Sequence, residues 1–171
     1  MKKIKRQKKQ LAKLRIGNKV KLRLLLPYLK KTDKIIDLGC GNMWLTNFLK
    51  NKDYNCVGFD IEKPADIVED VKKYKFKKNS FDVVIALELI EHVDCFSEIK
   101  KMLKPKGILI LSTPVPHLDW FCYLNERLGI FQKRTSPHSN LFYLKDVPAT
   151  SIYKKTLFGL VQFGVYKNLT R

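Results

Sequence analysis

The sequence predicts an α/β fold built on a mostly parallel sheet, and three observations support this prediction. Short apolar runs at residues 34–38, 55–59 and 81–87 alternate with segments of helical periodicity. The first run leads into a turn that contains Gly39 and Gly41, where the backbone can bend sharply. The run at 81–87 is apolar without alternation, as expected of a strand that is buried on both faces.

The chain begins with a basic segment that contains regularly spaced leucines. These leucines recur at roughly helical spacing between residues 11 and 29, which predicts one or two helices that cover the sheet. Gly17 and Asn18 interrupt the pattern, and Pro27 is expected to bend or end the helix. We therefore divide the chain into a basic arm with helices at residues 1–33 and a ligand-binding domain at residues 34–171.

The first predicted strand, residues 34–38, is followed by the glycine turn and by a helix over residues 42–51. Asp37 stands near the end of the strand and is expected to face a ligand over the turn. Trp44 occupies the place of the third glycine of a dinucleotide fingerprint, and no Gly-Lys-Ser/Thr of a P-loop follows. A glycine turn flanked by carboxylates and without phosphate-binding features suits a cationic, phosphate-free nucleoside.

The second predicted strand, residues 55–59, leads to Asp60. This acid follows the glycine turn by about 20 residues, a position from which a carboxylate accepts hydrogen bonds from ribose hydroxyls. Only residues 61–65 separate Asp60 from a third strand at 66–68, whereas a parallel connection normally takes about a dozen residues or more. The sheet is therefore expected to be trimmed at this edge.

Two carboxylates and an imidazole follow the fourth predicted strand, residues 81–87. Glu88, Glu91 and His92 stand at i, i+3 and i+4, so they would share one face if this segment is helical. Parallel strands place their carboxyl ends at one edge of the sheet, so the group is expected beside the glycine turn.

A further helix and a fifth strand are predicted next. The helix covers residues 97–103 and is broken by the Lys-Pro-Lys-Gly sequence at 104–107. The strand covers residues 108–112 and is expected to stop at Pro114, because proline cannot continue the hydrogen-bonded ladder.

The C-terminal part is aromatic and then alternating. Residues 117–143 are irregular and rich in aromatic side chains. Residues 151–157 and 160–167 alternate across a Phe158-Gly159 turn and predict an antiparallel hairpin, which leaves little room for a last helix.

Together these motifs resemble those of the class I S-adenosylmethionine-dependent methyltransferases. The resemblance covers residues 34–114 and rests on Asp-x-Gly-x-Gly at 37–41, Glu-His at 91–92 and Lys-Pro-x-Gly at 104–107. It implies a trimmed Rossmann-like sheet, bound S-adenosylmethionine and an aromatic cap over the acceptor. The expected cofactor-binding residues are Asp37, Gly39, Cys40, Gly41, Asp60, Ile61, Asp70, Val71 and Leu87.

The expected catalytic residues are His92, His138 and Glu88. A base is required only if the acceptor is a protonated hydroxyl or amine, and the two histidines are the imidazoles expected near the site. The Glu-x-x-Glu-His sequence also resembles the magnesium site of ubiquinone-pathway O-methyltransferases and of small-RNA 3′-terminal 2′-O-methyltransferases. This resemblance implies Glu88, Glu91, His92 and His138 as ligands of Mg²⁺, whereas a metal-free site with a plain histidine base remains the alternative.

The chain of 171 residues carries a formal net charge of +18, much of it near the N-terminus. Residues 2–34 can attract RNA or an anionic surface by counterion release, or they are merely a solvated basic face. No apolar run approaches the length of a membrane-spanning helix, and no signal peptide is recognisable. The four cysteines show no Cys-x-x-Cys spacing, which favours a reducing cytoplasmic location.

Three functions therefore stay open. The first is O- or N-methylation of a small or lipid-linked acceptor by S-adenosylmethionine. The second is methylation of RNA, for example at a ribose 2′-hydroxyl, with the basic arm as the RNA-binding segment. The third is a cofactor-binding scaffold without catalysis. Neither the acceptor nor the oligomeric state follows from the sequence.

Overall fold

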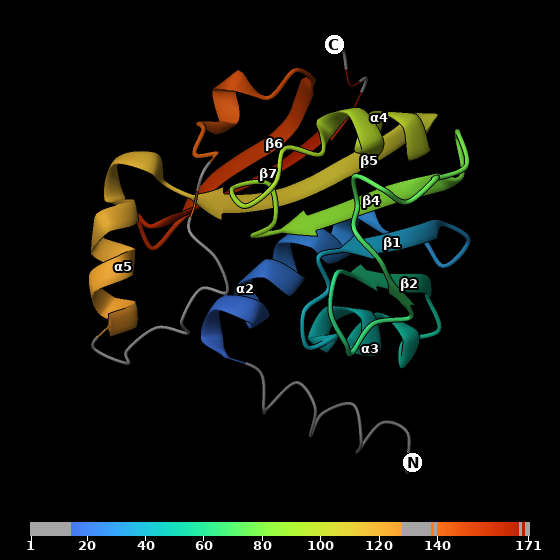
Figure 1. Ribbon diagram of the computed structural model, residues 1–171, viewed down its shortest axis with the longest axis horizontal. Helices are drawn as coiled ribbons and strands as arrows, with labels where there is room; N and C mark the ends of the chain where they lie inside the picture. The colour runs from blue at the N-terminus through green and yellow to red at the C-terminus, as the bar shows by residue number, and fades with distance from the viewer. Residues whose placement is uncertain (1–14, 128–137, 139, 168, 170–171) are drawn as a thin grey trace.

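The computed structural model describes residues 15–127, 138, 140–167 and 169, and shows a seven-stranded sheet with helices packed against it (Figure 1). The strands are β1 (Lys34–Leu38), β2 (Asn55–Asp60), β3 (Ile67–Val68), β4 (Phe81–Leu87), β5 (Leu103–Pro114), β6 (Thr150–Leu157) and β7 (Val161–Lys167). The α-helices are α2 (Ile16–Leu25), α3 (Trp44–Lys50), α4 (Phe96–Met102) and α5 (Asp119–Arg127). Short 3-10 turns are η1 (Leu26–Tyr28), η2 (Pro116–Leu118) and η3 (Leu144–Asp146). Residues 2–14 of the expected basic arm lie outside the described residues.

Helix α2 runs through Gly17 and Asn18, where the sequence predicted an interruption. A glycine in a helix interior costs only about 1 kcal/mol relative to alanine. Leu22 and Leu25 of the same helix are buried against the sheet, and burial of one leucine contributes about 1.5–3 kcal/mol. Packing therefore outweighs the local preference, and the α-helix ends only at η1, which begins at Leu26 and contains Pro27, near the predicted end.

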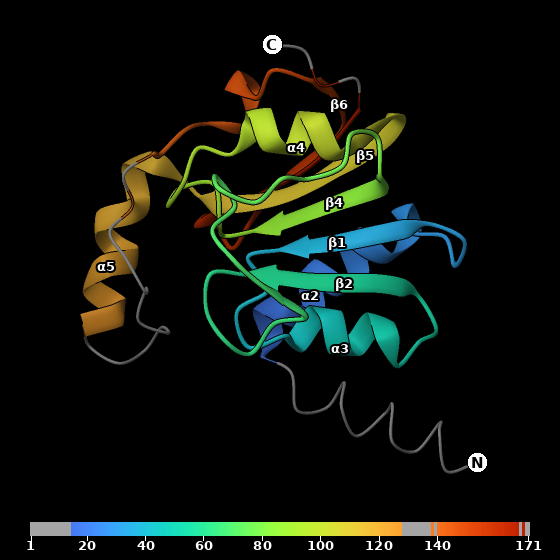
Figure 2. The same cartoon turned by 45° about the vertical axis from the view of Figure 1, so that its right-hand side comes forward.

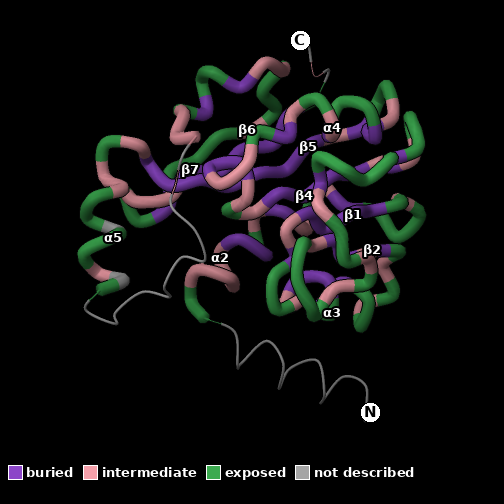
Figure 3. Tube along the Cα trace, in the orientation of Figure 1, coloured by how far each residue is buried: buried purple, intermediate pink, exposed green. Residues whose placement is uncertain are grey.

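Alternating side chains of the central strands pack into two apolar layers. In β1, Ile36 faces the layer that contains α4, whereas Ile35 faces the layer that contains α2 and α3. Val84 and Val83 of β4 divide between the same two layers. This explains the unbroken apolar sequence of β4, which is confirmed as a central strand, and Figure 3 shows the burial concentrated along these strands.

The connection from β2 to β3 contains no helix, which confirms the trimmed edge. Asp66 stabilises this short link: its Oδ2 accepts a hydrogen bond from the Gly58 amide at 2.7 Å, and its carboxylate pairs with Lys50 Nζ at 2.6 Å. These contacts hold the two residues of β3 parallel to β2.

Strand β5 is longer than predicted at both ends. Leu103 already pairs with Phe81, so the expected break at 104–107 lies inside the strand. At the other end Pro114 pairs with Val161, and the Pro114 carbonyl accepts a hydrogen bond from Gln162 Nε2 at 3.0 Å. Proline lacks only the N–H donor, and its carbonyl can still accept a hydrogen bond, so the strand ends at Pro114 rather than before it.

The C-terminal strands form the predicted antiparallel hairpin. β7 pairs antiparallel with both β5 and β6, while the pairs among β1 to β5 are parallel. The buried Tyr166 of β7 donates a hydrogen bond from its hydroxyl to the Leu144 carbonyl at 2.9 Å. This contact anchors the segment that precedes β6 to the sheet.

The strand order β3-β2-β1-β4-β5-β7-β6 places a reversal of chain direction across the sheet between β1 and β4. In open α/β sheets ligands bind outside the carboxyl ends of the strands at such a switch point. Figure 2 shows the carboxyl ends of β1, β2 and β4 directed towards the side of the molecule that carries α5. The described helices are all too short or too polar to cross a membrane.

Candidate active site

The turn after β1 is tied to β2 and open on one side. The amides of Gly39 and Cys40 both donate to the Phe59 carbonyl, at 2.8 and 3.1 Å. Gly39 and Gly41 adopt φ values of 73° and 50°, in the left-handed region where glycine is favoured. A Cβ placed on Gly41 would meet no atom within 4 Å, so a ligand has access to the backbone there.

Asp60, at the end of β2, lies directly against this turn. Its Oδ2 accepts a hydrogen bond from the Gly41 amide at 2.7 Å, and its Oδ1 accepts one from the Glu62 amide at 3.2 Å. The structure thus brings together the glycine and the carboxylate that the sequence paired by spacing alone.

Asp37 is oriented differently from the expectation that it faces a ligand. Its side chain is buried, and its Oδ2 accepts hydrogen bonds from the Thr46 amide at 3.1 Å and the Thr46 hydroxyl at 2.6 Å. Burial raises the pKa of Asp37 to about 6, and the charge of Asp60 adds to this, although the bonds from Thr46 oppose the shift. Asp37 therefore joins the end of β1 to α3 beneath the turn.

The raised pKa of Asp37 predicts a pH-dependent stability. The folded protein binds a proton at Asp37 more tightly than the unfolded chain, so the free energy of unfolding falls as pH rises from the ordinary aspartate pKa of 3.8 through about 6. At neutral pH the loss is about 3 kcal/mol at most, since one pKa unit corresponds to about 1.4 kcal/mol. Asp37→Asn keeps an oxygen for Thr46, so we expect it to stabilise the protein at about pH 7.5 and to have a clearly smaller effect at about pH 4.5.

Urea denaturation at the two pH values measures this effect. The exposed acid Asp146 provides a control, because Asp146→Asn should leave the pH dependence unchanged. Equal effects of Asp37→Asn at both pH values would contradict the assignment.

The other expected cofactor-binding residues differ in their surroundings. Ile61 is exposed next to Asp60, whereas Val71 is buried in the apolar layer that contains α4 and Leu87 packs against the opposite layer. Asp70 Oδ1 accepts a hydrogen bond from the Lys72 amide at 2.8 Å in a local turn. Burial raises the pKa of the Cys40 thiol to about 12, so this side chain is a neutral part of the turn.

The segment after β4 is a turn and not a helix, which corrects the predicted grouping of Glu88 with Glu91 and His92. Glu88 adopts a φ of 56°, and its carboxylate pairs with Nζ of the buried Lys21 of α2. The i, i+3 and i+4 rule applies only to a helix, so Glu88 points elsewhere. Leu89 lies against Gly39, because a Cβ placed on that glycine would be 2.9 Å from Leu89 Cδ1.

Glu91 is fully buried, and neither of its carboxylate oxygens has a hydrogen-bond partner among the described residues. Burial raises its pKa to about 8, and the charge of Glu88 acts in the same direction. The Thr113 hydroxyl offsets part of this rise in the pKa of Glu91, although it does not form a hydrogen bond with the carboxylate. A buried carboxylate without a partner is rare in proteins and calls for an explanation.

Glu91, His92 and His138 converge, although His138 is distant in sequence. Each offers one oxygen or nitrogen, and these atoms all lie within 4.8 Å of one another. The two imidazole rings meet edge to face with centroids 4.7 Å apart. Asn140 holds the later segment in place, because its amide donates to the Glu91 carbonyl at 3.0 Å and its side chain donates to the Ile90 carbonyl at 3.1 Å.

Asp119, the first residue of α5, is a site residue that the sequence analysis missed. Its Oδ1 lies 2.6 Å from His138 Nδ1, and both side chains are largely shielded from solvent. Nothing in the spacing of the two residues indicates this contact, because it depends on how the chain folds between them.

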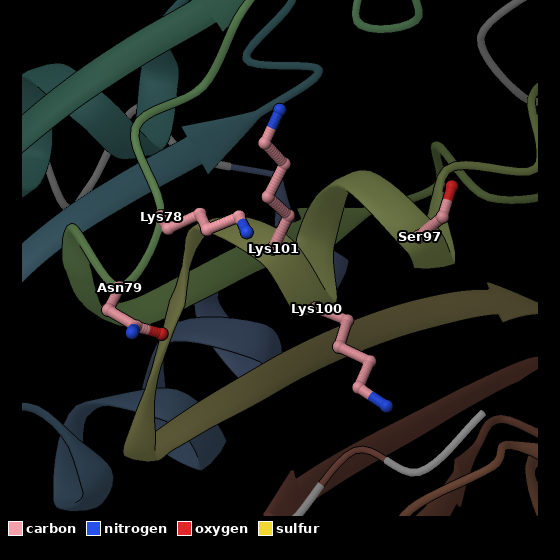
Figure 4. A pocket seen from close by; sticks show the side chains of 5 residues that line it. All are labelled: Lys78, Asn79, Ser97, Lys100 and Lys101. Atoms are coloured by element: carbon pink, nitrogen blue, oxygen red, sulfur yellow. The ribbon is translucent and has the colours of Figure 1, made fainter.

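A separate, shallow hollow lies between the loop before β4 and helix α4 (Figure 4). It has a volume of about 320 Å³ and is lined by Lys78, Asn79, Ser97, Lys100 and Lys101. The hollow lies at the amino end of β4, whereas the glycine turn and Glu91 lie at the carboxyl ends of the strands. It is therefore not part of the candidate active site.

Comparison with known proteins identifies the family. A family model described as a methyltransferase domain matches residues 8–146, which is most of the chain. The chain belongs to this methyltransferase family. The resemblance of the sequence motifs to S-adenosylmethionine-dependent methyltransferases is thereby confirmed at the level of the family.

Relatives of this methyltransferase domain include an uncharacterized protein of Methanocaldococcus jannaschii, which is 33% identical over 94 residues. A ubiquinone biosynthesis O-methyltransferase of Rickettsia bellii is 32% identical over 99 residues. The matches cover 48% and 47% of this chain, respectively, and 41% of each relative, so the chain matches less than half of their length.

Solved structures confirm the fold of the methyltransferase domain. The PH0226 protein of Pyrococcus horikoshii has a TM-score of 0.65 and is 21% identical, with 88% of this chain and 89% of that chain covered. An S-adenosylmethionine-dependent methyltransferase of Methanosarcina mazei has a TM-score of 0.63 and is 19% identical, with 86% and 98% covered. The predicted Rossmann-like architecture is thus confirmed.

Proposed function

We propose that this chain binds S-adenosylmethionine over the turn at Gly39–Gly41 and transfers its methyl group to a hydroxyl or amine of a small or lipid-linked acceptor. One observation carries the proposal: Leu89 lies against Gly39, so the turn after β4, with Glu91 and His92, adjoins the open glycine turn. Both turns follow strands that flank the switch point of the sheet, where ligands of such folds bind.

The residues around the glycine turn suit the cofactor. Gly41 leaves its backbone accessible, and Asp60 provides a carboxylate that can accept hydrogen bonds from ribose hydroxyls. Bound there, S-adenosylmethionine would supply a methyl group activated by a neighbouring sulfonium. In the proposed site Ile61, Asp70, Val71 and Leu87 line the nucleoside, and Asp37 holds the turn from below through Thr46.

The residues on the acceptor side of the site favour an acceptor whose hydroxyl must lose its proton. His92 and His138 lie together at the carboxyl edge, and an imidazole near this position can take the acceptor proton as the methyl group is transferred. The ubiquinone biosynthesis O-methyltransferase of Rickettsia bellii is named for transfer to oxygen, which supports the same preference. Positioning of the acceptor would account for much of the acceleration.

The metal implied by the sequence resemblance fits these residues in part. Three of the four expected ligands, Glu91, His92 and His138, converge, and the unpartnered Glu91 carboxylate suits a cation. Glu88 is not in the group, because it pairs with Lys21. A divalent ion held by the three residues would orient an acceptor hydroxyl and lower its pKa.

RNA is the second candidate acceptor, and one observation favours it. The ion pair between Lys21 and Glu88 places α2, which also carries the basic residues Lys19 and Arg23, next to the candidate active site. A polyanion that approaches the site would therefore meet positive charge. Affinity for RNA should then fall steeply with salt concentration.

Transfer of labelled methyl groups from S-adenosylmethionine to fractionated metabolites, lipids and RNA tests the proposal. Labelling of a small-molecule or lipid fraction supports it, and labelling of RNA alone supports the second candidate. If the cofactor binds and no fraction is labelled, the chain is a cofactor-binding scaffold. If the cofactor does not bind, the proposal is wrong.

A further inference from the structure

We propose that Asp119 is the positioning residue of a three-ligand site for a divalent cation, formed by Glu91, His92 and His138, which takes ions of the zinc class in preference to magnesium. The inference rests on the proposed function only for its role in catalysis, because cation binding itself does not require S-adenosylmethionine.

The contact between Asp119 and His138 is the first observation. Asp119 Oδ1 lies 2.6 Å from His138 Nδ1, and the exposed fractions of the two side chains are 17% and 6%. A histidine whose Nδ1–H donates to a carboxylate presents Nε2 as its basic nitrogen, which fixes its tautomer and ring orientation. Stabilisation of the N-terminus of α5 by the Asp119 charge would not require a partner on His138.

The surroundings of Glu91 are the second observation. Both carboxylate oxygens are buried and have no hydrogen-bond partner among the described residues, although one lies within 4.8 Å of ring nitrogens of His92 and His138. Leaving such a group without a partner is costly, and a bound cation would remove the cost. Lys21 does not fill this role in the structure: its ammonium pairs with Glu88, and neither oxygen of Glu91 accepts a hydrogen bond from it.

The choice of ion follows from the ligand atoms. The site offers one carboxylate and two imidazoles. Glu88 would add a second carboxylate, but it forms an ion pair with Lys21 and is not part of the site. Imidazole suits zinc, cobalt, nickel and iron, whereas magnesium prefers carboxylates, carbonyls and water. Three protein ligands leave a coordination position for a substrate oxygen, as in catalytic zinc sites, and a carboxylate behind one histidine is a usual companion.

Direct cation binding by the purified full-length protein tests the inference. Zn²⁺, Co²⁺ and Mg²⁺ are titrated separately against the wild type, Asp119→Asn and the control Asp146→Asn, whose acid is exposed. Calorimetry gives the affinity, and the visible absorption of bound Co²⁺ reports its coordination. We expect one bound Zn²⁺ or Co²⁺ per chain, at least about 100-fold weaker binding of Mg²⁺, and about 10- to 100-fold weaker Zn²⁺ binding by Asp119→Asn. The control should bind like the wild type.

A second variant and a check of folding distinguish loss of the cation site from misfolding. Glu91→Gln should abolish the increase in melting temperature that Zn²⁺ causes in the wild type, and circular dichroism checks that each variant is folded. Absence of Zn²⁺ and Co²⁺ binding by the wild type, equal affinity of Asp119→Asn, or binding of Mg²⁺ as tight as that of Zn²⁺ would each overturn the inference. S-adenosylmethionine is titrated in parallel: cation binding without cofactor binding contradicts the proposed function alone, and cofactor binding without cation binding contradicts this inference alone.

Discussion

Replacement of His138 by alanine is expected to lower the rate of methyl transfer by about two to four orders of magnitude, the usual contribution of a positioned general acid or base. His138 lies with Glu91 and His92 at the carboxyl edge and is held by Asp119, so its loss removes either the base or a cation ligand. The affinity for S-adenosylmethionine should change little, because Gly41 and Asp60 carry the proposed cofactor contacts.

His117 provides the matched control. It is exposed, and its Nδ1 lies 3.1 Å from the Tyr143 hydroxyl, so it belongs to a different set of contacts. We expect His117→Ala to retain most of the activity. Addition of a chelator then separates the two roles of His138: activity that is lost and returns with added cation indicates a cation site, and unchanged activity indicates a plain base. A fully active His138→Ala enzyme would contradict both.

Replacement of Asp60 by alanine should weaken the binding of S-adenosylmethionine by roughly 1–3 kcal/mol, the cost of losing a charged hydrogen-bond acceptor. The carboxylate lies against the Gly41 amide at 2.7 Å, next to the open face of the turn. Calorimetric titration of the wild type and the variant measures the difference.

Glu62→Ala is the control for this second prediction. Glu62 is exposed in the same loop, and only its backbone amide contacts Asp60, so its side chain should not affect binding. If Asp60→Ala binds the cofactor as tightly as Glu62→Ala does, Asp60 does not bind the ribose.

The geometry of the proposed cofactor turn could be predicted from the sequence because it depends on local structure. A strand followed by Gly39 and Gly41 specifies the turn, and the regular parallel packing of β1 and β2 then brings Asp60 to it. The same argument wrongly predicted that Asp37 faces a ligand. Residue type and strand position do not show that the Thr46 side chain lies close enough to bind this carboxylate.

The acceptor half could be predicted only in part. Glu91, His92 and His138 were all expected, and they converge, but Glu88 was grouped with them on the assumption of a helix. The chain instead turns at Glu88, and its partner Lys21 comes from α2, far away in sequence. Such contacts depend on tertiary packing, which residue spacing does not encode.

The remaining differences have similar causes. β5 was expected to cover residues 108–112 and does stop at Pro114 as predicted, but it includes this proline, whose carbonyl accepts a hydrogen bond from Gln162 of the neighbouring β7. Asp119 meets His138 only because α5 and the segment at Asn140 both return to the carboxyl edge. Part of the expected cap, residues 128–137 and 139, lies outside the described residues.

Amide NMR of protein labelled with ¹⁵N only at glycine tests the central claim most directly. The chain has eight glycines, of which Gly39 and Gly41 form the proposed cofactor turn, while Gly107 lies near the amino end of β5 and Gly164 lies within β7. On titration with S-adenosylhomocysteine, the demethylated cofactor, we expect the signals of Gly39 and Gly41 to shift with saturation at one equivalent, and those of Gly107 and Gly164 to stay in place. Unchanged Gly39 and Gly41 signals at a saturating concentration, or shifts confined to the remote glycines, would contradict the proposed site.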